Sequence, residues 1–372
     1  MLKIPENISF VLNTLTQNGY EAYIVGGCVR DALLGFTPSD FDITTSAKPQ
    51  EVINLFEKTI PTGINHGTVT VMVDKTPVEV TTFRTEGNYT DSRHPENVEF
   101  VTNLKEDLSR RDFTVNALAF NENIGLVDLF GGVRDLEAKI LKAVGDPEKR
   151  FSEDALRILR LFRFSSQLGF EIEEKTFCDA LKLGKTLENI SRERIFSELQ
   201  KALNGKNPQA ISPLINSGAL SFLGIDKPTD FYTKTENPDL RLFAFLKSVD
   251  NPISVLKNLK ASNKQIDTFS KLLKLSHLNL DTKEDIKNAL FETDTETLKT
   301  YFEYSGQEDD LLKEILVNNE PYLISHLEIS GEDLINLGFK NKEIGKQLEA
   351  LRQAVVKDPS KNKKETLLAL TK

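Results

Sequence analysis

Two short stretches near the start of the chain carry residue types that can do chemistry together. Gly26-Gly27-Cys28-Val29-Arg30-Asp31 joins a glycine pair to an arginine, and Asp40-Phe41-Asp42 follows it with two carboxylates. Alternation along an extended strand puts Asp40 and Asp42 on one face, where they repel each other unless a cation, most simply a divalent ion, lies between them. The glycine turn offers N–H groups, and Arg30 a guanidinium, to a phosphate. The pattern indicates phosphoryl or nucleotidyl transfer.

Each motif has a simpler explanation when it is taken alone. A D-x-D pair is often the solvated edge of a strand, and a glycine pair is often only a turn. The chain contains its own comparison, because Gly131-Gly132-Val133-Arg134-Asp135 repeats the first pattern and no paired carboxylates follow it. We interpret this second copy as a turn. The order and spacing of the first set are much more specific than its parts.

The surrounding sequence predicts the elements that hold these residues. Residues 22–25 form a short apolar strand that ends at the glycine pair, and a second strand carries Asp40 and Asp42. Two further strands are predicted over 67–73 and 76–83, followed by a polar loop over 85–95. On the second of these strands Glu79 lies between Val78 and Val80 in sequence, and its side chain points to the face opposite to theirs. It is either a third acidic residue of the metal site or an outward-facing glutamate of an edge strand.

Charged residues gather again between positions 103 and 168. Residues 103–111 predict a capped helix that ends near Arg110-Arg111-Asp112, where arginines also complement a helix dipole. A second helix is predicted from about Glu153 to Leu168, with an apolar arc facing the core and Asp154, Arg157, Arg160 and Arg163 across the opposite side. The simpler interpretation is a solvated helix face, on which an Asp154–Arg157 ion pair contributes about 0.2–0.5 kcal/mol.

Together these motifs resemble those of the class II tRNA nucleotidyltransferase and poly(A) polymerase family. The matches occur in the family's order: the glycine motif with Gly35, then Asp40-x-Asp42, Arg110 to Ala117, and Glu153-Asp154-x-x-Arg157. They cover residues 20–200, and a weaker resemblance runs from Ile329 to Leu370. The resemblance implies an α+β N-terminal nucleotidyltransferase head, with a mixed sheet and helices, followed by an all-α neck, body and tail in an elongated multi-domain chain.

The resemblance also implies roles for individual residues. Asp40 and Asp42 would hold two Mg²⁺ ions for a two-metal nucleotidyl transfer, with Glu79 as a further catalytic carboxylate. The glycine turn and the residues after it, Gly26, Gly27 and Arg30, would bind the nucleotide, with Arg111 on the triphosphate. Asp112 and Asn116 would bind the ribose. On the second helix, Asp154 and Arg157 would read the base, and Arg160 and Arg163 would bind the triphosphate or the primer phosphate. Asp128 would couple head and neck, and Arg194 would brace the nucleotide-reading helix.

The pair Asp154 and Arg157 suggests how a protein could choose a base without a template. A carboxylate accepts from an exocyclic amine, which cytosine presents at N4 and adenine at N6, while an arginine donates to the neighbouring ring acceptor. Uracil and guanine present a carbonyl oxygen where the amine would be, so two acceptors would face each other. The pair would therefore select CTP and ATP.

Length and composition set the remaining expectations. A chain of 372 residues with 39% hydrophobic residues predicts two to four packed units. We assign 1–138 to the head, 139–205 to the neck, 206–280 to the body and 281–372 to the tail.

The net charge of −9 argues against indiscriminate nucleic-acid binding, although arginines and lysines cluster between 139 and 163. Neither zinc spacing nor a membrane-length apolar run occurs, so we expect a cytoplasmic protein without a membrane partner. A monomer and a homodimer both stay open.

The resemblance is strongest to bacterial CCA-adding members, which implies addition of C, C and A from CTP and ATP to the tRNA 3′ end. A poly(A) polymerase or an A-adding enzyme is the near alternative, although Ala155-Leu156 replaces the proline typical of poly(A) polymerases. The loop over 85–95 disfavours a CC-only enzyme, in which it is deleted. A non-catalytic RNA-binding protein is the remote alternative, and the intact Asp40/Asp42 and Asp154/Arg157 pairs argue against it.

Overall fold

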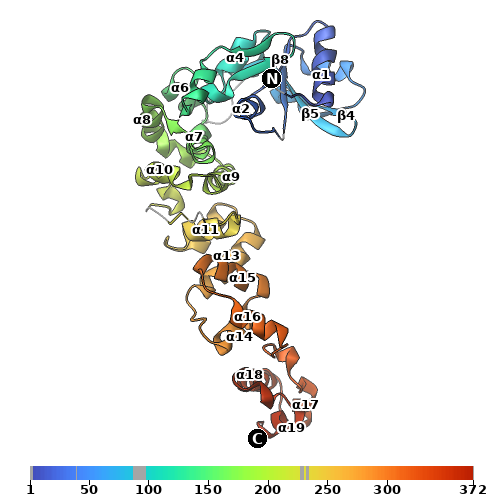
Figure 1. The fold of residues 1–372 in the computed structure, drawn as a ribbon, viewed down its shortest axis with the longest axis vertical. Helices are drawn as coiled ribbons and strands as arrows, with labels where there is room; N and C mark the ends of the chain where they lie inside the picture. The colour runs from blue at the N-terminus through green and yellow to red at the C-terminus, as the bar shows by residue number, and fades with distance from the viewer. Residues whose placement is uncertain (1–2, 39, 87–97, 227–229, 232–233, 372) are drawn as a thin grey trace. The chain divides into compact units, whose positions relative to one another are not determined.

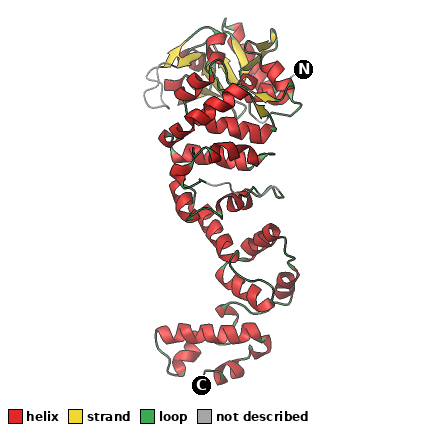
Figure 2. Ribbon diagram, turned by 90° about the vertical axis from the view of Figure 1, so that its left-hand side faces the viewer, coloured by secondary structure: helices red, strands yellow, loops and turns green. Residues whose placement is uncertain are grey.

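The computed structural model describes residues 3–38, 40–86, 98–226, 230–231 and 234–371. The chain separates into two compact units. Unit 1 comprises residues 1–236 with 258–260, and unit 2 comprises 237–257 with 261–372. Strands are confined to unit 1, and unit 2 is helical over its described residues (Figures 1 and 2). The predicted fold class, a mixed sheet with helices followed by a helical region, is confirmed.

A seven-stranded sheet in the order β3-β4-β5-β2-β1-β8-β9 forms the centre of the head. β2 and β5 run parallel, and the other neighbouring pairs are antiparallel. The pairing register places Asp42 beside Glu79 and Glu79 beside Thr70. The strands are β1 Ala22–Val25, β2 Asp42–Thr45, β3 Thr59–Gly63, β4 Thr68–Val73, β5 Thr76–Thr82, β8 Leu118–Asn121 and β9 Gly125–Asp128.

Both faces of this sheet are covered. Side chains alternate along β1, so Ala22 and Ile24 join one apolar cluster with α1 and α3, while Tyr23 and Val25 join another with Leu104 and Leu108 of α4. A strand buried on both faces positions the turn that follows it rigidly. The head helices are α1 Glu6–Gln17, α2 Gly27–Leu33, α3 Pro49–Leu55, α4 Leu104–Ser109 and α5 Gly132–Glu137.

Three sequence predictions need correction in the head. β2 begins at Asp42, so Asp40 lies in the segment before the strand. The loop predicted from residue 85 begins inside β6, Arg84–Glu86, which pairs with β7, Val98–Phe100, and residues 87–97 lie outside the described residues. β3 was not predicted at all, because its residues Thr59–Gly63 are largely exposed and show no apolar alternation.

The neck packs directly against the head within unit 1. α7 lies against α9, and Gly205 follows α9 where the backbone of Ser166 and Gln167 leaves no room for a side chain. A short parallel pair links β10, Ile140–Leu141, with β11, Glu171–Ile172, which follows α7. The helices of this region are α6 Pro147–Glu153, α7 Leu156–Leu168, α8 Glu174–Leu183 and α9 Arg192–Leu203, and α10 Ser212–Asn216 follows it.

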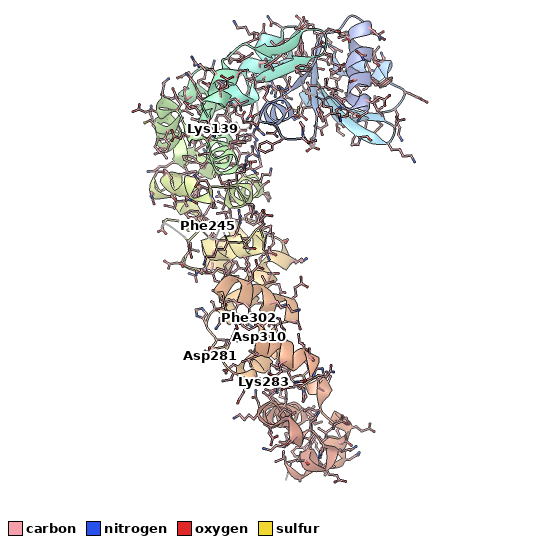
Figure 3. All side chains as sticks on the ribbon, in the orientation of Figure 1. Lys139, Phe245, Asp281, Lys283, Phe302 and Asp310 are labelled. Carbon is pink, nitrogen blue, oxygen red and sulfur yellow. The ribbon has the colours of Figure 1, made fainter. Side chains whose placement is uncertain are left out.

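Two apolar clusters hold much of the second half of unit 2 together. One gathers residues between Leu275 and Ile315, including Phe302, and the other gathers residues between Leu327 and Leu367 (Figure 3). Lys287 is fully buried and pairs with Glu320 at 2.6 Å. The helices are α11 Pro238–Leu246, α12 Pro252–Asn258, α13 Asn263–Leu275, α14 Lys283–Glu292, α15 Thr295–Ser305, α16 Asp310–Val317, α17 Gly331–Asn336, α18 Lys342–Lys357 and α19 Lys364–Ala369.

Short 3₁₀ segments connect many of these elements, at 64–66, 114–116, 184–189, 208–211, 221–223, 324–326 and 359–361. Within the described residues, none of the helices has the length and apolar character that crossing a membrane would require.

The close packing at Gly205 leads to a stability prediction. A Cβ there would lie 2.7 Å from the carbonyl carbon of Ser166 and 2.9 Å from the nitrogen of Gln167. We expect Gly205→Ala to lower the free energy of unfolding of unit 1 by about 1–3 kcal/mol, because backbone cannot move aside cheaply. Urea unfolding followed by circular dichroism, with hydrogen exchange at α7 and α9, measures this. Gly345→Ala in α18, where nothing lies within 4 Å, is the control; equal effects would contradict the explanation.

Candidate active site

The acidic residues line one cavity of the head. This cavity, of about 760 Å³, is lined by Asp40, Asp42 and Glu79 together with Thr70 and residues of the segment before β2. Asp42 and Glu79 reach it from neighbouring positions on β2 and β5, and Asp40 reaches it from the connection that precedes β2. The structure therefore brings all three predicted carboxylates to the same surface.

The chemistry of this cavity fits a hard divalent cation. Burial raises the pKa of Asp42, nearby Arg111 opposes that rise, and repulsion from Asp40 adds to it, so the net shift is upward. A bound cation would relieve this repulsion. Among the described residues no group of three acidic, histidine or cysteine side chains is arranged to hold a metal. The donors thus fit an ion held by two carboxylates and completed by substrate phosphate and water, as Mg²⁺ often is.

The glycine turn lies next to Arg111, which is far from it in the sequence but close to it in the folded head. Gly26 has φ +80° and ψ −134°, a conformation that only glycine adopts easily, and α2 begins directly after it. A Cβ on Gly26 would lie 3.0 Å from Nη1 of Arg111. On α2, buried Arg30 donates from Nη1 to Oδ1 of Asn116 at 2.6 Å. The turn, Arg30, Arg111 and Asn116 therefore form one group.

The second glycine motif forms the turn between β9 and α5, and its later residues begin the helix. Gly131 has φ +77°, and α5 begins at Gly132. The N–H groups of Gly132 and Val133 donate to the carboxylate of Asp128 at 2.8 and 3.0 Å. In this copy the chain itself supplies the anion that the first turn of a helix favours. The coupling role of Asp128 stays a prediction.

Asp112 and Asn116 connect the head to the neck. Oδ1 of Asp112 accepts from the Phe113 N–H at 2.8 Å and from Asn116 at 3.1 Å, while Oδ2 accepts from Nε and Nη2 of Arg160 at 2.9 and 2.5 Å. Burial alone would raise the pKa of Asp112, but Arg160 and these hydrogen bonds outweigh it and lower the pKa to about 2. Asp112 is therefore ionised throughout the physiological range.

Three guanidiniums lie around one aromatic ring. The ring of Phe164 on α7 lies 3.9 Å from Arg163, 5.1 Å from Arg30 and 5.3 Å from Arg160. Arg163 also pairs with Glu198 of α9 at 3.1 Å. Burial, and then repulsion from Arg160, lower the pKa of Arg163 to about 10. Of the three, Arg160 is the most exposed, at 32% of its side chain.

The single helix predicted from Glu153 is broken at Asp154, one of the two residues predicted to select the base. α6 ends at Glu153, Asp154 is extended with φ −139° and ψ 104°, and α7 begins at Leu156. The break lets Asp154 pair with Arg194 of α9 at 2.9 Å. The core-facing arc is confirmed, but the solvated-face interpretation is wrong, because Arg157 and Arg163 are each 8% exposed.

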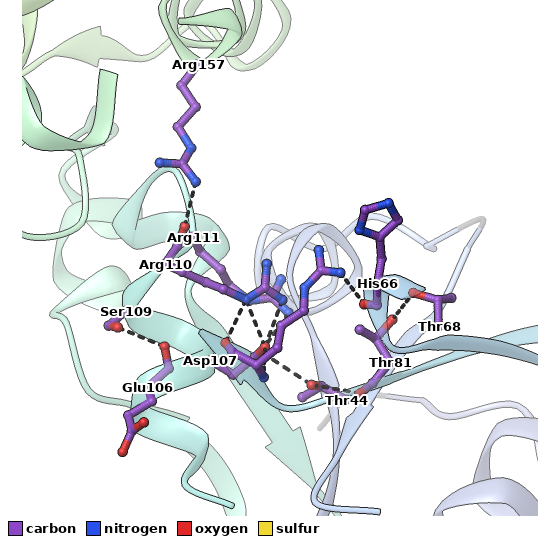
Figure 4. Close-up of polar contacts among 11 residues, drawn as sticks. Thr44, His66, Thr68, Thr81, Glu106, Asp107, Ser109, Arg110, Arg111 and Arg157 are labelled. Atoms are coloured by element: carbon purple, nitrogen blue, oxygen red, sulfur yellow. Dashed lines mark hydrogen bonds and ion pairs between the residues drawn. The ribbon is translucent and has the colours of Figure 1, made fainter. Parts of the chain in front are cut away.

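Arg157 is held by three groups, two from α6 and one from the end of α4. Its Nη1 donates to Glu153 at 2.7 Å and to the Arg150 carbonyl at 2.9 Å, and its Nη2 donates to the Arg110 carbonyl at 3.0 Å (Figure 4). The nucleotide-reading arginine predicted from the neck is thus linked to the backbone of the arginine pair in the head.

Sequence reasoning missed Asp107 of α4. Its side chain is fully buried and accepts hydrogen bonds from Thr44 and from Arg110 and Arg111 (Figure 4). The signal was present, because a carboxylate three and four residues before two arginines on a helix is spaced to meet both.

The low pKa of Asp112 predicts a pH-dependent stability. A carboxyl whose pKa is lower in the folded state stabilises it above the unfolded pKa near 4, and this contribution is lost as the pH falls towards 2. The difference in unfolding free energy between the parent and Asp112→Asn should therefore shrink by about 2 kcal/mol between pH 6 and pH 2. Urea titrations at several pH values measure it; a difference independent of pH would contradict the assignment.

Three family models match consecutive parts of the chain. The model described as "Poly A polymerase head domain" matches residues 22–142, "Probable RNA and SrmB- binding site of polymerase A" matches 169–224, and "tRNA nucleotidyltransferase domain 2 putative" matches 234–371. The order is that of a polymerase head domain, a probable RNA-binding region and a second tRNA nucleotidyltransferase domain.

Relatives match over nearly the whole length. The CCA-adding enzyme of Enterococcus faecalis is 38% identical over 97% of this chain and 94% of its own, and that of Lactobacillus helveticus is 40% identical over 96% and 94%. The solved structure of the Bacillus stearothermophilus CCA-adding enzyme in complex with CTP has a TM-score of 0.80 at 32% identity, covering 98% of this chain and 97% of that one. The chain therefore belongs to the class II tRNA nucleotidyltransferase and poly(A) polymerase family, among its CCA-adding enzymes.

Proposed function

We propose that this chain adds C, C and A, one nucleotide at a time, to the 3′ end of tRNA, using CTP and ATP and releasing pyrophosphate. The observation that carries the proposal is the cavity that brings Asp40 and Asp42 together near the glycine turn and Arg111. Full-length similarity to CCA-adding enzymes, one of them solved with CTP, supports it. The four-part division into head, neck, body and tail stays part of the proposal.

Family membership implies a divalent metal, and we propose Mg²⁺ held by Asp40 and Asp42. When bound, the metal lowers the pKa of the primer 3′-hydroxyl and stabilises charge on the triphosphate and the leaving pyrophosphate. Glu79 lies beside Asp42 in the strand register and supports the site from β5. We assign it a secondary role, because the three carboxylates do not form a ready three-ligand cluster among the described residues.

The arginines at the glycine turn position the triphosphate. Arg111, together with N–H groups after Gly26 and Gly27, faces the phosphates, while Arg30 is held by Asn116 and supports the turn. Arg160 is the more exposed of the two neck arginines and contacts phosphate, whereas Arg163 is buried against Phe164 and holds that ring. Charges fixed before the substrate arrives need no reorganisation during the reaction, and this lowers the barrier.

Asp112 and Asn116 bind the ribose, and Asp154 and Arg157 read the base. Asp154 is extended between two helices and is oriented by Arg194, so its carboxylate is placed by the protein rather than by the substrate. Glu153 and the Arg110 carbonyl orient Arg157 in the same way. Such a fixed donor and acceptor pair favours cytosine and adenine over uracil and guanine by about 1–3 kcal/mol for each good contact.

Extension of a tRNA that lacks its CCA end tests the function. With Mg²⁺ and CTP we expect two additions, and a third only when ATP is also present, with products resolved to one nucleotide. Long tails from ATP alone would instead indicate a poly(A) polymerase, and extension only of tRNA ending in CC would indicate an A-adding enzyme. Absence of incorporation by folded protein that binds tRNA would favour a non-catalytic RNA-binding protein.

The same assay tests the carboxylate pair. Asp40→Ala and Asp42→Ala should each lower the rate of addition about a thousandfold or more, because each removes part of the charge that holds the metal. Binding of tRNA, measured by filter retention, should change little. Glu122→Ala removes an exposed carboxylate of the same head outside the cavity and is the matched control. Turnover retained by Asp42→Ala would overturn the metal assignment.

Base selection gives a separate prediction. Asp154→Ala should lower the preference for CTP over UTP, taken as the ratio of kcat/KM values, by about tenfold to a hundredfold, because the amine of cytosine loses its acceptor. Arg194→Ala should cause a smaller loss of the same kind. Glu148→Ala, an exposed carboxylate of the neighbouring helix α6, is the control. An unchanged ratio in Asp154→Ala would exclude this residue from base reading.

A further inference from the structure

Asp107 is a charged residue that the proposed mechanism does not yet use. It lies on α4, its side chain is 0% exposed, and both of its oxygens are occupied. Oδ1 accepts from Nε and Nη2 of Arg110 at 3.1 and 2.8 Å and from the N–H of Arg84 at 3.4 Å. Oδ2 accepts from Oγ1 of Thr44 at 3.3 Å and from Nη2 of Arg111 at 3.4 Å.

These contacts join four segments of the chain around the active site. Thr44 lies on β2 two residues after Asp42, and Arg84 begins β6. Arg110 donates through Nε to the Arg84 carbonyl at 3.1 Å, and its own carbonyl accepts from Arg157 of the neck helix. Arg111 lies against the glycine turn. Figure 4 shows the two arginines of the pair converging on one carboxylate while Arg157 reaches the backbone behind them.

The need for a charge at this position follows from electrostatics. The guanidiniums of Arg110 and Arg111 both pair with the buried carboxylate of Asp107, so they lie close to one another. Because this region is buried, the repulsion between the two positive charges is weakly screened. Burial alone would raise the pKa of Asp107, but the two arginines outweigh it and the pKa is lowered. Removing this charge frees Arg111 to turn away from Arg110 and from Gly26. A buried carboxylate shared by two arginines fixes both directions at once.

We propose that Asp107 is a positioning residue for the incoming nucleotide: it holds Arg111 at the glycine turn for the triphosphate and, through the backbone of Arg110, holds Arg157 for the base. This inference rests on the proposed function, because it deepens the role of the same site. The competing explanation is structural only, with Asp107 anchoring α4 to the sheet through Thr44 and the Arg84 N–H.

A double-mutant cycle separates the two explanations. Asp107→Asn keeps the shape of the side chain, leaves an amide oxygen that can accept from the Arg84 N–H and an amide N–H that can donate to the Thr44 hydroxyl, and removes the charge. We expect it to raise KM for both CTP and ATP about tenfold to a hundredfold, with KM for tRNA changed less than about twofold. In an Arg111→Ala background the same change should have a much smaller further effect, limited to the part that acts through Arg110 and Arg157, because the triphosphate-binding group held by Asp107 is already missing. Effects that multiply independently would overturn the proposal.

Thr44→Val is the matched control for the structural explanation. It removes the hydroxyl contact to Asp107 and leaves the charge, so KM for CTP and ATP should stay within about twofold of the parent; a rise equal to that of Asp107→Asn would overturn the proposal. Circular dichroism verifies that each variant is folded. Direct titration with CTP in the absence of tRNA repeats the cycle on Kd. If the parent protein incorporates no nucleotide, the proposed function fails, and the binding cycle still decides the role of Asp107.

Discussion

The structure around the candidate site depends on holding many positive charges close together without substrate. Arginines from the head and the neck meet where these two regions pack, and repulsion between them is weakly screened by the surrounding protein. Each is restrained by a partner that also positions it: a buried carboxylate, a backbone carbonyl or the face of Phe164. The excess positive charge that remains is complementary to a triphosphate, so the protein is prepared for this ligand before it binds.

The negative residues follow the opposite arrangement. The acidic cavity gathers Asp40, Asp42 and Glu79, where burial and repulsion from Asp40 raise the pKa of Asp42, and no arginine is among the residues that line it. A nucleotide that bridges the two regions would place its phosphates between fixed cations of the protein and a metal. Most of the catalytic work then lies in orientation and charge, because no side chain has to form a covalent bond to the substrate.

Sequence reasoning predicted the chemistry better than the exact backbone. The alternation of buried valines around Glu79 predicted its strand and face, but the register that sets it beside Asp42 depends on a parallel pairing between residues 37 positions apart. The break at Asp154 could not be predicted either, because local propensity favours a continuous helix and the long-range pair with Arg194 favours an extended residue. The spacing of Asp107 from Arg110 and Arg111 on a helix could have predicted their contacts, but the burial of Asp107 depends on the tertiary packing and could not.

The parallel pairing of β2 with β5 also bears on how this head can change in length. The connection from β2 through α3 and β3 to β4 is a crossover whose length does not enter the pairing of β2 and β4 with β5 at the acidic cavity. Residues added between α3 and β3 leave these pairings unchanged, whereas the Asp74–Lys75 tip, where both φ angles are positive, is followed by Thr76 and Pro77, which line the cavity. One residue added inside β5 would instead turn Glu79 to the other face of the sheet. An insertion in this domain should therefore preserve the acidic cavity when it lies in the connection between α3 and β3 and disrupt the cavity when it lies within β5.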